Sequence, residues 1–161
     1  VPYDSLIMSS FNFSLNESMG WSRNQFDRLV HFAYGLLLAY PIRELYCRIA
    51  DTKGFWSYFS PINFILATSM IYELIEWGAA GLFGGDLGMA YLGTQGDVWD
   101  AHKDMALAGL GAFIAMTITL CINISIRKGF SDEWTSSLKI KSNTPLGEDE
   151  ISRLRNQNKE K

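Results

Sequence analysis

Three aspartates near the middle of the chain are spaced so that they share one face of a helix. Asp97, Asp100 and Asp104 follow an i, i+3, i+7 pattern, and side chains three or four positions apart are neighbours on a helix surface. Thr94 or Asp97 is the expected N-cap of this helix, and acids in a first turn favour the helix dipole. Capping therefore accounts for one or two of these acids, but Asp104 lies a full turn deeper and needs another explanation.

Two further pairs with helical spacing could act together with these aspartates. Asp27 and His31 are four apart, so the carboxylate could receive a ring N–H and fix the histidine tautomer, as it does beside metal-binding imidazoles. Glu73 and Glu76 are three apart, and two close carboxylates persist by sharing a proton, by pairing with cations or by holding a metal. Two structural interpretations compete: an interfacial histidine bonded to water, and an ion-pair network without chemistry.

Cations and a glycine-flanked turn accompany these acids. Arg28 and Lys103 are candidate partners for a phosphate or a carboxylate. Two glycines, at positions 93 and 96, flank Thr94 and Gln95, a turn whose backbone N–H groups could meet a phosphate. The neighbouring aspartates oppose an anion there unless a cation intervenes. We therefore assign cofactor or ligand binding to Arg28, Thr94, Gln95 and Lys103.

The donor atoms predict the class of metal ion. Carboxylate oxygens with at most two imidazoles suit a divalent Mg, Mn, Fe or Zn ion better than copper or an iron–sulfur centre. Such an ion could bridge to a lipid phosphate and activate water. No Walker loop, HExxH motif or nucleophile elbow is present. We assign the metal ligands to Asp27, His31, Asp97 and Asp100, and the candidate catalytic roles to Glu73, Glu76 and Asp104.

Three hydrophobic segments must position these side chains, and they predict an all-α fold, a polytopic helical membrane bundle. The predicted spans are about 24–49, 54–83 and 104–127. The clearest contains Met105–Ile126, 22 residues without a charge, which is long enough to cross a bilayer. Its pairs Ala108/Ala112 and Gly111/Ala115 are four apart, and small residues at that spacing predict close contact with another helix.

Basic residues predict how the spans are oriented. Arginines and lysines are concentrated in the 43–53 connection and after the third span, so the positive-inside rule places both in the cytoplasm. The predicted segments are an N-terminal extracytoplasmic or interfacial segment (1–22), a transmembrane domain (23–128) and a polar cytoplasmic tail (129–161) with a short helix near 148–155. The acids of all three spans then fall toward the outer face. Because a charge in hydrocarbon costs ~2.5–3.5 kcal/mol, such a convergence indicates a function.

Composition narrows the function classes. The chain has 161 residues and a net charge of -3, and without a basic stripe it predicts no nucleic-acid partner. Cys47 and Cys121 lie in hydrophobic segments, where buried small side chains are expected rather than a disulfide or zinc framework. Because the first residue is Val1, we expect further sequence upstream.

Three blocks within residues 21–126 carry a family resemblance by their order and spacing. They are Asn24–Phe32, Tyr72–Trp77, and Tyr91–Asp100 followed by Asp104-Met105. This pattern resembles the YjdF-type family of bacterial inner-membrane proteins, itself remotely similar to the VanZ-like family. The resemblance implies a multi-pass protein of the bacterial inner (plasma) membrane. It also implies upstream helices of the same protein, or an oligomer partner, beside these spans. It implies no reaction.

Two function hypotheses follow for a protein in the lipid bilayer. In the first, an outward-facing polar pocket binds or processes an envelope lipid or other amphiphile with a divalent metal, and an unliganded glutamate serves as general base. In the second, a proton- or ion-coupled transporter or a membrane scaffold subunit uses the same acids as a relay or packing network. Transporters bind substrates near the midplane on broken helices, whereas these acids cluster toward one face, which favours the first hypothesis. The sequence does not decide whether the protein is an enzyme.

Overall fold

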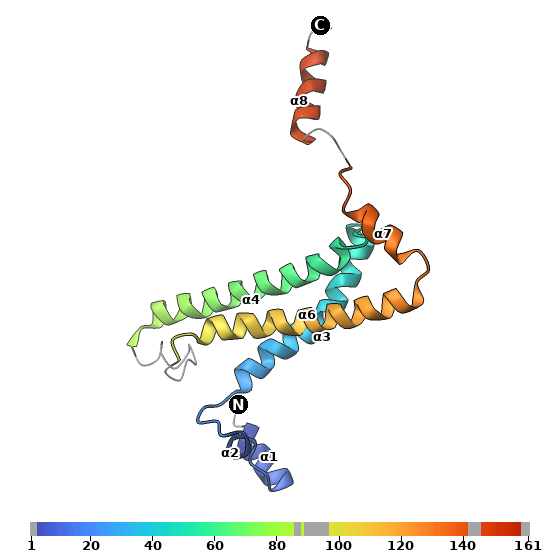
Figure 1. Cartoon of the computed structure of the whole chain (residues 1–161). Coiled ribbons are helices and arrows are strands. Elements are labelled where there is room, and N and C mark those ends of the chain that lie inside the picture. The colour runs from blue at the N-terminus through green and yellow to red at the C-terminus, as the bar shows by residue number, and fades with distance from the viewer. Residues whose placement is uncertain (1–2, 86–87, 89–96, 142–145, 159–161) are drawn as a thin grey trace.

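The computed structural model describes residues 3–85, 88, 97–141 and 146–158, and within these ranges every regular element is a helix. Figure 1 shows three long helices lying against one another, with shorter helices at both ends of the chain. In chain order the elements are α1 (Tyr3–Phe11), α2 (Leu15–Met19), α3 (Phe26–Ile49), α4 (Trp56–Phe83), α6 (Asp100–Ile126), α7 (Phe130–Ser137) and α8 (Leu146–Gln157). The prediction of an all-α fold is confirmed.

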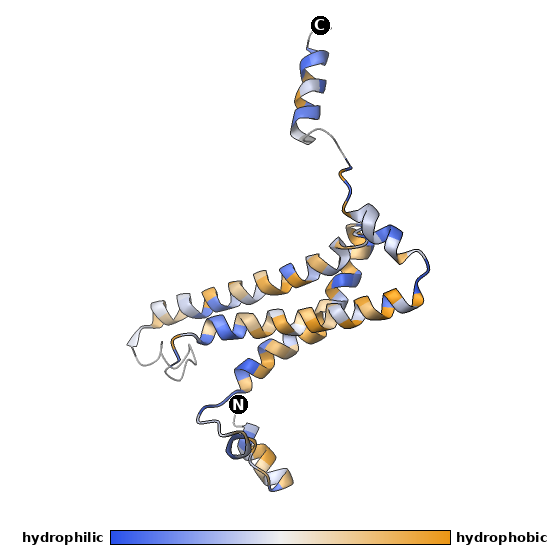
Figure 2. Cartoon of the chain, viewed as in Figure 1, coloured by the Kyte–Doolittle hydropathy of each residue, from blue (hydrophilic) through white to orange (hydrophobic). Residues whose placement is uncertain are grey.

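The three long helices coincide with the three hydrophobic segments. α3 and α4 each begin two residues later than expected, and α6 begins at Asp100, four residues earlier. α4 ends where Gly84 adopts a positive φ of 63°, a backbone conformation that favours glycine at a helix terminus. Of the described helices, α6 is long and apolar enough to cross a membrane by length and composition. α3 carries charges near both ends, and α4 carries several serine and tyrosine side chains, which lower their hydropathy (Figure 2).

The α6 N-terminus differs from the expected one. Trp99 occupies the N-cap position, and its side chain makes no capping hydrogen bond. The expectation of Asp97 as N-cap is therefore wrong, and Thr94 lies outside the described residues. Asp97 instead accepts the Trp99 backbone N–H at 3.1 Å. This two-residue bond is a local turn of the kind that aspartate favours before a helix.

Small residues let α6 pack closely on α3. Ala108, Gly111 and Ala112 are all buried on α6, and they face Gly35 and Ala39 of α3, which are also buried. The two backbones approach so closely that a Cβ added at Gly35 would lie 2.9 Å from the Ala112 nitrogen and nearer still to the Ala108 carbonyl. The predicted helix contact through small residues is confirmed. α4 packs against both α3 and α6 and completes the bundle.

The first helix of the polar tail returns to the bundle, which the sequence did not indicate. Glu133 Oε1 accepts the Gly54 N–H at 3.1 Å, and Ser137 Oγ accepts the Phe55 N–H at 3.0 Å. α7 therefore supplies acceptors for backbone donors at the start of α4, which a helix cannot satisfy internally. The Trp134 ring packs on Tyr58 of α4 at a centroid distance of 5.9 Å. α8 covers the short helix expected near 148–155 and extends away from the bundle, with a mostly hydrophilic surface (Figures 1 and 2).

Candidate functional site

His31 is the centre of a cluster built from all three long helices. It lies in the second turn of α3 and its side chain is buried. Its Nε2 is 3.3 Å from Glu73 Oε1 of α4 and 3.8 Å from Asp27 Oδ1, one turn earlier on α3. Its Nδ1 shares a hydrogen bond of 3.3 Å with the Ser69 hydroxyl of α4. The Tyr72 ring packs edge-on against the imidazole, with 5.6 Å between the two ring centroids. Both ring nitrogens therefore have defined partners.

Asp104 of α6 completes this cluster from the third helix. Asp27, His31 and Asp104 each offer one ligand atom, and these three atoms lie within 4.8 Å of one another. Asp104 is 2% exposed. Its Oδ1 has no hydrogen-bond partner within the described parts of the chain, and Glu73 Oε1 makes no hydrogen bond there although it lies 3.3 Å from His31 Nε2. Because buried polar atoms are almost always satisfied, such an oxygen calls for a water, an ion or another group beside it, or for a protonated acid. We call Asp27, His31, Glu73 and Asp104 the His31 cluster.

A second, separate cluster balances charges at the start of α6. Asp100 is 3% exposed, and its carboxylate lies 2.8 Å from Arg23 and 3.3 Å from Arg28. Asp97 lies 2.6 Å from Lys103, 2.7 Å from Arg28 and 3.4 Å from Arg23. Three cations thus surround two carboxylates, and these close pairs satisfy the charge of both acids. We call these five residues the arginine network.

The pKa of Asp97 yields the first prediction. Hydrogen bonds from the Lys103 side chain and the Trp99 backbone N–H hold the pKa of this carboxyl at about 2, below its ordinary 3.8. A lowered pKa means that Asp97 stabilises the fold fully above about pH 4, and that this contribution is lost as the pH falls toward 2. Unfolding of wild type and Asp97→Asn, followed by circular dichroism between pH 6 and 2.5, should give a stability difference that shrinks on acidification. A difference independent of pH would contradict the predicted pairing.

The structure divides the residues that the sequence grouped together. Asp27, His31, Glu73 and Asp104 lie in one cluster, whereas Asp97, Asp100, Arg28 and Lys103 lie in the other. Glu76 is half-buried on α4, three residues beyond Glu73. Thr94 and Gln95 lie outside the described residues. The metal and catalytic assignments to individual residues stay predictions, but the two clusters now separate acids that are paired with cations from acids that are not.

Sequence reasoning missed one member of the arginine network and one residue that contacts the His31 cluster. Arg23 precedes α3 and reaches Asp100 across 77 positions of sequence, so no local spacing pointed to it. Ser69 bonds His31 from α4, and its hydroxyl lies in an apolar helix where serine ordinarily bonds its own backbone. Ser69 lies four residues before Glu73 on the same helix, so helical spacing from that acid could have found it.

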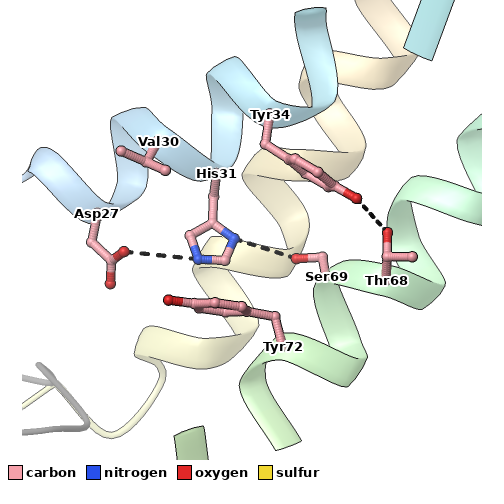
Figure 3. Close-up of a pocket in the computed structure, with 7 residues that line it drawn as sticks. All are labelled: Asp27, Val30, His31, Tyr34, Thr68, Ser69 and Tyr72. Atoms are coloured by element: carbon pink, nitrogen blue, oxygen red, sulfur yellow. Dashed lines mark hydrogen bonds and ion pairs between the residues drawn. The ribbon is translucent and has the colours of Figure 1, made fainter. Parts of the chain in front are cut away.

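A cavity of about 240 Å³ opens beside the His31 cluster, between α3 and α4. Asp27 and His31 line it together with Val30, Tyr34 and Tyr72, and Figure 3 shows these side chains converging from the two helices. A hydrogen bond of 2.6 Å between the Tyr34 and Thr68 hydroxyls crosses from α3 to α4 and lies at the end of the cavity away from Asp27 (Figure 3). A molecule in the cavity would therefore touch two of the three grouped ligand atoms.

Comparison with known proteins supports the family resemblance. The family described as "Predicted membrane protein (DUF2238)" matches residues 1–124. The inner membrane protein YjdF of Escherichia coli (strain K12) is 45% identical over 101 residues, which are 62% of this chain and 48% of that protein. The chain thus spans about half the length of the curated relative that it matches. No solved structure matches it. The wider similarity to VanZ-like proteins stays a prediction. Since the family match covers more than half of the sequence, the chain belongs to the DUF2238 family of predicted membrane proteins, the YjdF-type family.

Proposed function

We propose that this chain is a multi-pass protein of the bacterial inner membrane that holds a divalent metal ion in the His31 cluster. α3, α4 and α6 would cross the bilayer, with the cluster near the outer face and the tail in the cytoplasm. Asp27, His31 and Asp104 would ligate the ion. Mg, Mn, Fe or Zn suits two carboxylates and an imidazole. The site would serve a lipid or other amphiphile of the cell envelope.

The observation that carries this proposal is the buried Asp104 carboxylate. One of its oxygens has no hydrogen-bond partner among the described side chains, and it lies beside His31 and Asp27. Glu73 Oε1 also makes no hydrogen bond there, but it lies 3.3 Å from His31 Nε2. A metal ion would satisfy such oxygens, because carboxylates are its preferred ligands and its charge offsets theirs. Asp97 and Asp100 are already paired with cations, so the proposal moves their ligand role to Asp104 beside Asp27 and His31.

Elemental analysis of the full chain, purified in mild detergent, tests the proposal. We expect one equivalent of a divalent metal in the wild type and a loss of at least tenfold in metal content in Asp104→Asn and in His31→Gln. Asp97→Asn is the matched control, because it changes an acid of the arginine network and leaves the three ligands in place. Circular dichroism confirms that each variant is still helical.

Two results of the elemental analysis would contradict the proposal. A metal-free wild type, or equal metal content in Asp104→Asn and wild type, would contradict the metal site. A folded, metal-free protein would favour the alternative function, a proton- or ion-coupled transporter or a scaffold subunit that uses the same acids as a relay or packing network. Proton uptake by reconstituted vesicles separates the transporter from the scaffold.

Ser69 should control the metal affinity without touching the ion. When Nε2 faces the acids and an ion, Nδ1 must carry the proton, and the Ser69 oxygen at 3.3 Å is its acceptor. Loss of such a supporting partner typically lowers metal affinity by about 10–100-fold. We expect that loss in Ser69→Ala and recovery in Ser69→Thr, measured by competition with a fluorescent chelator. Thr68→Val is the control, because it removes a neighbouring hydroxyl that bonds Tyr34 instead. Equal affinities in Ser69→Ala and wild type would exclude this role.

A further inference from the structure

We propose that the cavity beside His31 binds the phosphate headgroup of a membrane lipid, which enters sideways from the bilayer between α3 and α4. This inference rests on the metal site and names its substrate class. Three features of the molecule support it: the residues that would hold the ion, the depth of the cavity and the side chains at its mouth.

The first feature is the small number of protein ligands that the site offers to an ion. Three protein ligands leave positions open on a divalent ion, and ions such as Mg²⁺ are commonly bound through one or two carboxylates together with phosphate oxygens of a substrate. Asp104 and His31 are buried, whereas the Asp27 side chain is 42% exposed and lines the cavity. Asp27 and His31 both line the cavity, so a molecule in the cavity would reach an ion held by them. Glu73, the remaining acid of the cluster, reaches His31 from α4 and is not among the side chains that line the cavity.

The second feature is the depth of the cavity along α3. Along α3 the cavity extends from Asp27 to Tyr34, a rise of about 10 Å at 1.5 Å per residue. Asp27 is the second residue of α3, so in a crossing helix the polar end of the cavity lies at headgroup level. The opposite end lies within the hydrocarbon. The cavity thus changes from a charged end at Asp27 to an uncharged end at Tyr34 and Thr68, in the same direction as a lipid of the outer leaflet.

The third feature is the exposure of the side chains at the mouth of the cavity. Val30 is 45% exposed and Tyr72 is 50% exposed, and both line the cavity. The lining side chains come from α3 and α4, so the mouth opens along the seam between these two helices (Figure 3). In a bilayer such a mouth, bordered by an aliphatic and an aromatic side chain, faces lipid rather than water. At about 240 Å³, the cavity has room for a phosphate headgroup, and the acyl chains would remain in the bilayer.

A binding experiment with three probes tests this assignment. The full chain, loaded with Mn²⁺ in mild detergent, is titrated with dioleoyl phosphatidic acid, dioleoylglycerol and inorganic phosphate, and Mn²⁺ electron paramagnetic resonance reports contact with the ion. We expect phosphatidic acid to bind at least tenfold more tightly than inorganic phosphate. Dioleoylglycerol should leave the Mn²⁺ spectrum unchanged. Equal affinity for phosphatidic acid and inorganic phosphate would overturn the lipid assignment and identify a site for a free anion.

Variants at the mouth complete the test. Val30→Trp should lower the affinity for phosphatidic acid at least tenfold while the binding of Mn²⁺ stays unchanged; Val30→Phe should act in the same direction. Leu37→Trp is the control, because Leu37 is 67% exposed on the same helix two turns further along and is not a lining residue. Equal weakening by Leu37→Trp and Val30→Trp would overturn the proposed mouth. Mn²⁺ uptake without lipid binding would contradict this inference alone, whereas no Mn²⁺ uptake would contradict the proposed function and this inference with it.

Discussion

Gly35→Ala is expected to destabilise the bundle by about 3 kcal/mol, at the upper end of the usual cost of an overfilled core. The added Cβ would fall on the Ala108 carbonyl oxygen of α6 and lie 2.9 Å from the Ala112 nitrogen. These are backbone atoms, so no side chain can turn aside, and the two helices must separate. Gly111→Ala should behave alike, because its Cβ would lie 2.7 Å from the Leu36 nitrogen of α3. Reversible unfolding in mixed detergent micelles measures the change.

Glycines of α4 provide the matched control. A Cβ added at Gly78 or Gly81 would meet nothing within 4 Å. Glycine inside a helix costs roughly 0.5–1 kcal/mol relative to alanine, so Gly78→Ala should be neutral or slightly stabilising. The same chemical change thus has opposite signs on two helices. If Gly35→Ala and Gly78→Ala gave the same result, the close approach of α3 and α6 would be wrong.

Asp100→Ala is expected to cost about 3–5 kcal/mol, the usual effect of removing one partner from a buried ion pair. Asp100 is buried between Arg23 and Arg28. Its removal would leave Arg28 with Asp97 and would take from Arg23 its shorter ion pair, while the 3.4 Å contact to Asp97 stays. Because a buried carboxylate that balances two arginines is lost, the cost should be larger than the worth of a single pair. Chemical unfolding of the purified variant measures the change.

A double variant separates this explanation from a general loss of packing. Arg23→Gln combined with Asp100→Asn removes both charges and should recover part of the stability lost in Asp100→Ala. Glu150→Ala is the control on α8, because it breaks an exposed pair with Arg153, and such pairs contribute about 0–1 kcal/mol. Metal content should be unchanged in Asp100→Asn. A loss of metal together with unchanged stability would return Asp100 to the metal ligands.

Spacing within single helices was enough to predict much of the site. Asp27 and His31, four apart on one helix, lie in contact range as expected. The small-residue pairs of α6 face another helix, and the three hydrophobic segments are the three long helices. These features depend on helix periodicity and on local apolar composition, both of which a sequence carries directly. The family resemblance rested on the same residues.

The tertiary structure alone decided how the acids are divided. Asp97 precedes α6, and Asp100 and Asp104 lie about one turn apart on it. Their spacing set Asp104 apart as the deeper acid, but it did not show which acids meet cations. The arginines lie against Asp97 and Asp100, whereas Asp104 lies with Asp27 and His31 of α3. That division depends on the packing of α3 against α6 through Gly35 and Gly111, which sets the depth of each side chain. Such a contact joins residues more than 70 positions apart, so its register is a property of three packed helices, and the sequence of any one helix does not contain it.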